Sequence, residues 1–148
     1  MTLSELKKGL LSLMQTIYPE TEYKYYGMDV SEGFERPSFF TQIKPVEMDP
    51  NNYNSRNNRV TFFIDYMQEI VDEVDALDKI QQIRDSFGLA VKIGDRAVKV
   101  VSYDYDFIGT ERNIPEISID LEWMDRIDHT ENLPLMESAE INQEMMED

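Results

Sequence analysis

The chain contains no cysteine and a single histidine, His129, among its 148 residues. Without cysteine it has no disulfide framework, no thiol nucleophile and no thiolate zinc site. One histidine excludes histidine-rich metal sites and argues against a Ser-His-Asp triad. The sequence also has no phosphate-binding glycine loop, no dinucleotide fingerprint and no nucleophile elbow. We therefore expect no catalytic residues, no cofactor and no bound metal.

Basic residues are scarce too, with 14 Lys and Arg against 30 Asp and Glu and a formal net charge of -16. This imbalance argues against nucleic-acid binding through phosphate neutralisation. Long apolar runs are missing, so we expect no membrane-spanning segment. No basic region precedes an apolar run at the N-terminus, so we expect no signal peptide and a cytoplasmic site of synthesis.

Enough apolar material is present for one folded domain, because 41% of the residues are hydrophobic and 11% are aromatic. The acids gather at the end, where residues 130–148 hold six acidic and no basic residues. We therefore predict a domain over residues 1–129 and an acidic C-terminal tail over residues 130–148. The tail is interpreted either as a disordered end or as an arm that orders on a partner. Its apolar residues are Leu133, Leu135, Met136, Ile141, Met145 and Met146.

The first half of the chain predicts one helix and three strands. Apolar spacing predicts a helix over residues 3–17, with Thr2 and Glu5 as a capping box. Strands are expected over residues 23–30, 37–44 and 59–67, the last of them central and covered on both faces. Residues 46–58 are polar, with five asparagines, and are predicted to form a loop.

The second half repeats this order. Asp75 is predicted to cap a helix whose apolar stripe is Leu77, Ile80, Ile83 and Phe87 and which ends at Gly88. Residues 90–93 and 96–101 form a hairpin through Gly94-Asp95. The second of these strands continues to residue 107, and residues 116–124 form the last strand. Apolar residues change phase near residues 100–102, which predicts a β-bulge or a strand that joins a second apolar surface.

These elements predict an α+β fold. Two helices pack on one mainly antiparallel β-sheet, in the order helix, three strands, helix, three strands.

Five acids share one face if the last two strands pair across residues 109–114. Like charges directly opposite one another destabilise a sheet. The face could be solvated and screened, hold a divalent ion as in a two-metal nuclease, or meet basic groups of a partner. No His or Lys stands at ligand spacing, which weakens the metal alternative. The candidate acidic face is Asp104, Asp106, Glu116, Asp120 and Glu122.

Several short motifs in the first half resemble one known family. They are Tyr18-Pro19, Tyr26-Gly27, the segment Gly33-Phe34-Glu35-Arg36-Pro37-Ser38-Phe39-Phe40, and the aromatic strand over residues 58–66. Together they resemble the tail terminator, or tail completion, proteins of long-tailed bacteriophages and phage-tail-like particles. The resemblance covers the first half in sequence and the second half by element order.

The resemblance implies a virion structural protein that forms a homohexameric ring on the head-proximal end of the tail tube. Such a ring ends tube polymerisation and provides the joint to a head–tail connector or, in contractile tails, to the sheath. It implies assembly in the host cytoplasm, no catalytic residues, and DNA that passes through without tight binding. The alternatives are a metal-dependent phage nuclease that uses Asp104, Asp106 and Asp120, or a small acidic inhibitor that mimics nucleic acid.

Two segments are candidate interfaces in such an assembly. The loop over residues 46–58 is longer than an ordinary hairpin loop, and Arg56 within it and Arg59 directly after it would meet acids of an adjacent copy. The tail would supply apolar contacts to a neighbouring tail component. The candidate interface residues are Asn51, Asn52, Tyr53, Arg56, Arg59, Leu133, Leu135, Met136 and Ile141.

Overall fold

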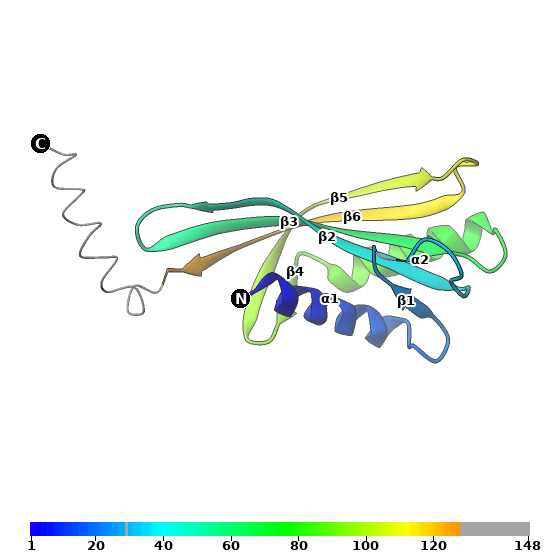
Figure 1. Ribbon diagram of the computed structural model, residues 1–148, viewed down its shortest axis with the longest axis horizontal. Helices are drawn as coiled ribbons and strands as arrows, with labels where there is room; N and C mark the ends of the chain where they lie inside the picture. The colour runs from blue at the N-terminus through cyan, green and yellow to red at the C-terminus, as the bar shows by residue number, and fades with distance from the viewer. Residues whose placement is uncertain (29, 128–148) are drawn as a thin grey trace, which may run out of the picture.

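A computed structural model of the chain describes residues 1–28 and 30–127 (Figure 1). The predictions for His129, Leu133, Leu135, Met136 and Ile141 lie outside the described residues. The elements are α1 (Leu3–Ile17), β1 (Lys24–Tyr26), β2 (Ser38–Pro50), β3 (Ser55–Met67), α2 (Glu73–Phe87), β4 (Ala90–Ile93), β5 (Arg96–Ile108) and β6 (Ile114–Arg126). The predicted order of helix, three strands, helix, three strands is therefore confirmed.

The strands form one sheet in the order β1-β2-β3-β6-β5-β4, and both helices lie on the same side of it (Figure 1). The sheet is mixed rather than mainly antiparallel as predicted, because β1 pairs in parallel with β2. Residues 27–37 cross back to the start of β2 instead of turning as a hairpin, and a crossover connection gives a parallel pair.

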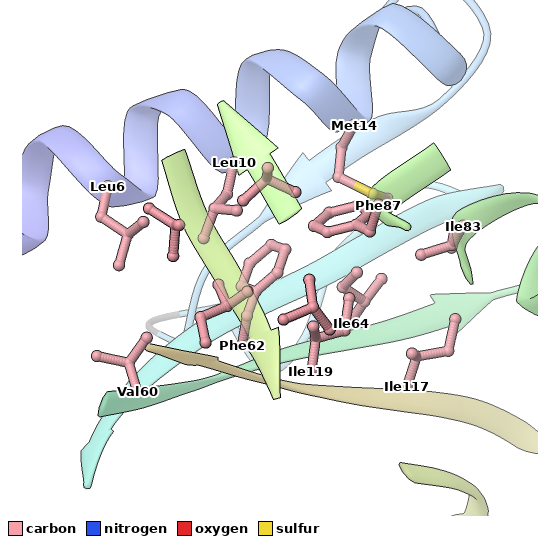
Figure 2. Packing of buried hydrophobic residues seen from close by; sticks show 14 of the residues in the cluster. Leu6, Leu10, Met14, Val60, Phe62, Ile64, Ile83, Phe87, Ile117 and Ile119 are labelled. Atoms are coloured by element: carbon pink, nitrogen blue, oxygen red, sulfur yellow. The ribbon is translucent and has the colours of Figure 1, made fainter. Parts of the chain in front are cut away.

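The hydrophobic core lies between the helices and the centre of the sheet. Alternation in β3 and β6 sends Val60, Phe62 and Ile64 to the helix side, opposite Leu121, Ile119 and Ile117. Leu6, Leu10 and Met14 of α1 cover them, spaced by four residues as one helix face requires (Figure 2). Fully burying each such side chain contributes about 1.5–3 kcal/mol, so this layer supplies much of the stability.

The second helix begins earlier than predicted. Its N-cap is Asp72, whose carboxylate accepts a hydrogen bond from the Val74 N–H at 3.0 Å. Asp75 lies within the first turn and faces inward, where it accepts a hydrogen bond from the Tyr66 hydroxyl at 2.7 Å. The helix ends at Gly88 as predicted, with a φ of 62° that favours glycine. The buried face is Ala76, Lys79, Ile83 and Phe87, and Leu77 is outside it.

A buried lysine ties α2 to the rest of the domain. Lys79 is only 9% exposed, and its ammonium group lies 2.9 Å from Asp75 and over the rings of Tyr18, Tyr23 and Tyr66. Burial alone would lower its pKa, but the hydrogen bonds to Asp75 and Tyr23 and their charges raise it above the usual value. This cage joins α2 to the end of α1, to the residue preceding β1 and to β3.

The prediction of a loop over residues 46–58 is wrong. The β2–β3 ladder continues outward to the pair Pro50–Arg56, and the turn spans only residues 51–54. Polar residues can form strands here because this hairpin projects past the helices, so neither face needs the apolar alternation of a core strand (Figure 1). We call residues 46–58, together with the end of β6 that pairs with them, the arm.

The predicted bulge in β5 is confirmed. The β5–β6 register shifts between Val100 and Ser102, so the even-numbered Val98 and Val100 and the odd-numbered Tyr103 all reach the helix side. Before the bulge, β5 pairs with β4, and this hairpin folds back onto α1. The extra residue therefore lets one long strand contribute buried side chains to two parts of the core.

We predict that Gly9→Ala destabilises the protein, although alanine favours a helix interior by about 0.5–1 kcal/mol over glycine. A Cβ at Gly9 would lie 2.8 Å from Cδ1 and Cγ2 of Ile93, and such overpacking costs about 1–3 kcal/mol. Thermal unfolding should show a lower Tm for Gly9→Ala. In an Ile93→Ala background the same change should raise the Tm, and a decrease there would contradict the steric explanation.

Candidate functional site

The sheet face that points away from the helices carries most of the candidate residues, and we call it the outer face. The strand register arranges it as rows that run across β2, β3, β6 and β5. From the turn of the β5–β6 hairpin toward the arm, the rows are Phe40–Asp65–Glu116–Asp106, Gln42–Phe63–Ser118–Asp104, Lys44–Thr61–Asp120–Ser102 and Glu47–Arg59–Glu122–Lys99. The rows differ in charge: acids without bases occupy the first, and acids and bases alternate in the last.

The five predicted acids share this face by register, but their surroundings differ. Asp106 lies opposite Glu116, while Asp104 lies opposite Ser118. Glu122 lies between Arg59 of β3 and Lys99 of β5. Repulsion is therefore concentrated at one end of the face instead of extending along it.

Asp120 is compensated within the chain. It pairs with Arg59 at 3.1 Å and accepts hydrogen bonds from the hydroxyls of Thr61 at 2.7 Å and Ser102 at 3.1 Å. Burial would raise its pKa, but these hydrogen bonds and the Arg59 charge hold it below the usual value. Arg59, which we expected to meet acids of an adjacent copy, is thus engaged by its own subunit.

Asp65 is the acid that the sequence analysis missed. It lies directly opposite Glu116, with Asp106 on the far side of Glu116. Burial, the hydrogen bond with Glu116 and the charge of Glu116 together raise the pKa of Asp65 to about 8. With a pKa of about 8, Asp65 holds its proton near neutral pH. The signal was available, because odd-numbered residues of the β3 strand fall on the same face as the even-numbered acids of β6.

A groove of about 330 Å³ lies beside this carboxyl pair. The pair and Phe63 form one side of it, and Met28 and Val30 of the β1–β2 connection form another. Edge-to-face aromatic contacts hold that connection on the outer face: the Phe34 ring centroid lies 4.9 Å from that of Phe40 and 6.1 Å from that of Tyr26. The segment over residues 33–40 therefore closes part of the outer face.

The structure offers little support for a metal centre on these strands. Within residues 1–28 and 30–127, no group of three or more His, Cys, Asp or Glu side chains could hold a metal ion. The guanidinium of Arg59 lies against Asp120, where the nuclease alternative would need a cation.

Within residues 1–28 and 30–127, no helix is long and apolar enough to cross a membrane.

The arm carries the other candidate residues. Asn51, Asn52 and Tyr53 form its turn, which is closed by hydrogen bonds from the Asn51 and Asn52 N–H groups to the Ser55 carbonyl at 2.8 and 3.2 Å. Tyr53 is 44% exposed. Arg56 follows on β3 and is exposed.

A carboxylate fixes the base of the arm. Asp125 accepts hydrogen bonds from the Asn58 amide at 2.9 Å and the Trp123 indole at 3.2 Å, and it pairs with Arg96 at 3.1 Å. Burial would raise its pKa, but the Trp123 hydrogen bond, the Met1 amino group and Arg96 lower it. Because Arg96 follows the β4–β5 turn, this network fastens the arm to the hairpin that rests on α1.

The sequence as a whole matches the profile of one protein family. The phage tail terminator protein family matches residues 5–132, a span that runs from α1 to beyond β6. The chain belongs to the phage tail terminator family. This family is a structural one, so the chain is assigned a structural role in the phage tail, in association with other tail components.

Comparisons with individual proteins support the fold and add no functional information to this family assignment. No curated protein matches the sequence. One solved structure, whose name carries no functional description, covers 86% of this chain and 97% of its own with a TM-score of 0.51. Its sequence identity to this tail terminator family member is 9%, so the likeness concerns the architecture only.

We predict that Asp65→Asn changes the pH dependence of stability. Because the folded-state pKa of Asp65 is raised to about 8, the folded chain holds a proton that the unfolded chain has lost. Stability from this source is therefore complete below about pH 4 and declines as the pH rises toward 8. Relative to wild type, Asp65→Asn should gain at least about 3 °C in Tm between pH 5.5 and 8.5.

The matched control is Asp104→Asn, which removes one charge from the same face opposite Ser118. It should follow the wild-type pH profile. Parallel profiles for Asp65→Asn and Asp104→Asn would show that general charge reduction, and not the proton on Asp65, sets the pH dependence.

Proposed function

We propose that the chain forms a ring that caps the head-proximal end of a phage or phage-like tail tube. The ring ends tube polymerisation and provides the joint to the head connector or, in a contractile tail, to the sheath. The family match over residues 5–132 carries this proposal, because members of a tail terminator family act at the end of a tail. We further propose that the ring is a homohexamer assembled in the host cytoplasm.

The arm supports self-association of this kind. It projects beyond the helices and is fastened at its base by Asp125, so it presents a rigid surface to a neighbour (Figure 1). We propose that its turn residues Asn51, Asn52 and Tyr53, together with Arg56, contact an adjacent subunit or ring. Arg59 contributes indirectly, since its pairing with Asp120 fixes the strand from which Arg56 projects.

The charge of the domain suits passage of DNA through a ring. Residues 1–129 carry 24 acids against 14 bases, a net charge of -10, because six of the 30 acids lie in residues 130–148. Phosphate is repelled by such a surface, so DNA would pass in transit without tight binding. We propose that the outer-face acids Asp104, Asp106 and Glu116 contribute to this repulsion.

We propose that residues 130–148 form a separate acidic segment that attaches the ring to a neighbouring component. The described chain reaches Ile127, whose N–H donates to the Asn54 carbonyl at 2.8 Å, so the segment starts from the end of the arm. Leu133, Leu135, Met136 and Ile141 would supply apolar contact area. Charge alone would be weak, because exposed ion pairs contribute about 0–1 kcal/mol each.

Tube polymerisation tests the proposed function. Purified tail tube protein from the same particle should form tubes of uncontrolled length by itself. Adding the ring protein at the start should shorten the tubes and leave a density at one end in negative-stain images. Tubes of unchanged length with unoccupied ends, at saturating protein, would refute a terminator role for this chain.

Truncation tests the division of the chain. Deleting residues 130–148 should leave the Tm within about 2 °C, because the core of the described chain is built from residues that precede residue 124. The truncated protein should still cap tubes but bind the sheath or connector protein more weakly, with the largest loss at low salt. A domain that unfolds after truncation would show that these residues belong to the core.

A further inference from the structure

The start of α2 exposes an apolar surface that nothing in the described chain covers. Ile70 is 79% exposed, Val71 63%, Val74 66% and Leu77 49%. Within the helix, Val74 and Leu77 are three residues apart and therefore lie on one side, opposite the buried face of Ala76, Ile83 and Phe87. We call these four residues the α2 stripe. Isolated exposed apolar residues are ordinary, but a contiguous group of this kind marks an interaction surface.

Acids predominate around the α2 stripe, where one base, Arg112, lines a pocket with Val71 and Glu73. Glu69 and Glu73 are exposed at its start, and Asp78 follows Val74 by one helical turn. Asp75 is already paired with the buried Lys79, so the negative charge at the rim comes from the other acids. A partner that fits this surface must combine apolar side chains with positive charge. Residues 130–148 do not meet this requirement, because they hold six acids and no base.

The arm has the complementary character. Its exposed apolar side chains include Val46 at 57%, Met48 at 39% and Met124 at 53%. Arg56 and Arg126 are both exposed near its end, but the register places them on opposite faces. Arg56 shares the helix-side face with Met48, whereas Arg126 shares the other face with Met124 and the exposed acids Glu47 and Asp49. The helix-side face is therefore the one that is apolar and positive. Among the described residues neither arginine forms an ion pair, whereas Arg59 and Arg96 at the base do.

These two surfaces lie at opposite ends of the molecule. The arm forms one end of the long axis, and α2 begins near the other end, beside the β5–β6 turn (Figure 1). A contact between two different patches is head-to-tail, and a head-to-tail contact closes into a ring when the rotation between copies permits it. An arm seated on its own α2 stripe is excluded, because the domain core separates them.

We propose that the arm of one copy packs on the α2 stripe of the next copy, and this inference rests on the proposed ring. The helix-side face of the arm makes the contact: Met48 covers the apolar residues of α2, and Arg56 meets the acids at the rim. Val46, at the register shift of β2, adds apolar area. Apolar contact supplies the affinity and the charges set the direction of the contact. The acid-rich rim also disfavours the reverse pairing of two α2 stripes.

Two variants that each lose one surface test this pairing. In the arm variant, Met48→Asp and Arg56→Glu remove the apolar and positive character of the helix-side face of the arm. In the stripe variant, Val74→Asp places a charge at the centre of the exposed surface. Native mass spectrometry should show each variant alone as a monomer. An equimolar mixture should form a 1:1 dimer that does not grow, because only one intact arm and one intact stripe remain.

Two further variants are controls. Leu89→Asp changes an apolar residue that is 88% exposed but outside the α2 stripe, and it should leave the ring intact. Arg56→Glu alone repeats the arm test with a single charge reversal, and it should also give a monomer. Circular dichroism melts verify that every variant is folded.

The outcomes separate the pairing from the ring itself. A mixture that stays monomeric, while wild type forms rings, would show that the arm and the α2 stripe do not meet. Rings formed by either single variant would also overturn the pairing but leave the proposed function standing. Wild-type protein that stays monomeric even on tube ends would overturn the proposed ring and this inference with it.

Discussion

The pairing of β3 with β6 is the constraint on which the other features depend. The ladder runs without interruption from the pair Ser55–Arg126 to the pair Asp65–Glu116. One register places Phe62 opposite Ile119 in the core and, on the other face, sets two carboxyl groups side by side. A slip of one residue would turn the apolar set outward and the acids inward, at a cost of several buried side chains. The carboxyl pair persists because the core fixes the register that creates it.

Charge is handled differently in three places of the same domain. Asp120 and Asp125 are held ionised by arginine and by hydrogen-bond donors, which stabilises the centre of the sheet and the base of the arm. Asp65 has no such base beside it, and burial next to Glu116 raises its pKa to about 8, so it is protonated instead. Lys79 is buried among tyrosine rings and is paired with Asp75, which is half-buried. A chain of this net charge therefore folds by pairing interior acids with bases or hydrogen-bond donors. The other acids lie on surfaces where water screens their repulsion or where the repulsion serves the function.

Several features could be predicted from the sequence because their causes are local. The capping box of Thr2 and Glu5, the stop at Gly88 and the turn at Gly94 each depend on a few adjacent residues. The bulge between Val100 and Ser102 was visible because alternation changes phase there. The cap of α2 was misplaced because Asp72 and Asp75 are equally good caps by residue type. Tertiary contacts chose between them, since Tyr66 and Lys79 draw Asp75 into the interior.

The sequence by itself determined the two helices, the four apolar strands, the acidic balance and the likeness to tail terminators, because periodicity and composition are properties of the chain. The arm was decided only by tertiary structure. Residues 46–58 have no apolar alternation, and they become strands because β6 offers backbone partners alongside them. The same is true of the parallel β1–β2 pair and of Asp65, whose pKa depends on a neighbour that is 51 residues away in sequence. Hydrogen-bond partners and electrostatic neighbours from distant segments are fixed by packing, so no local pattern records them.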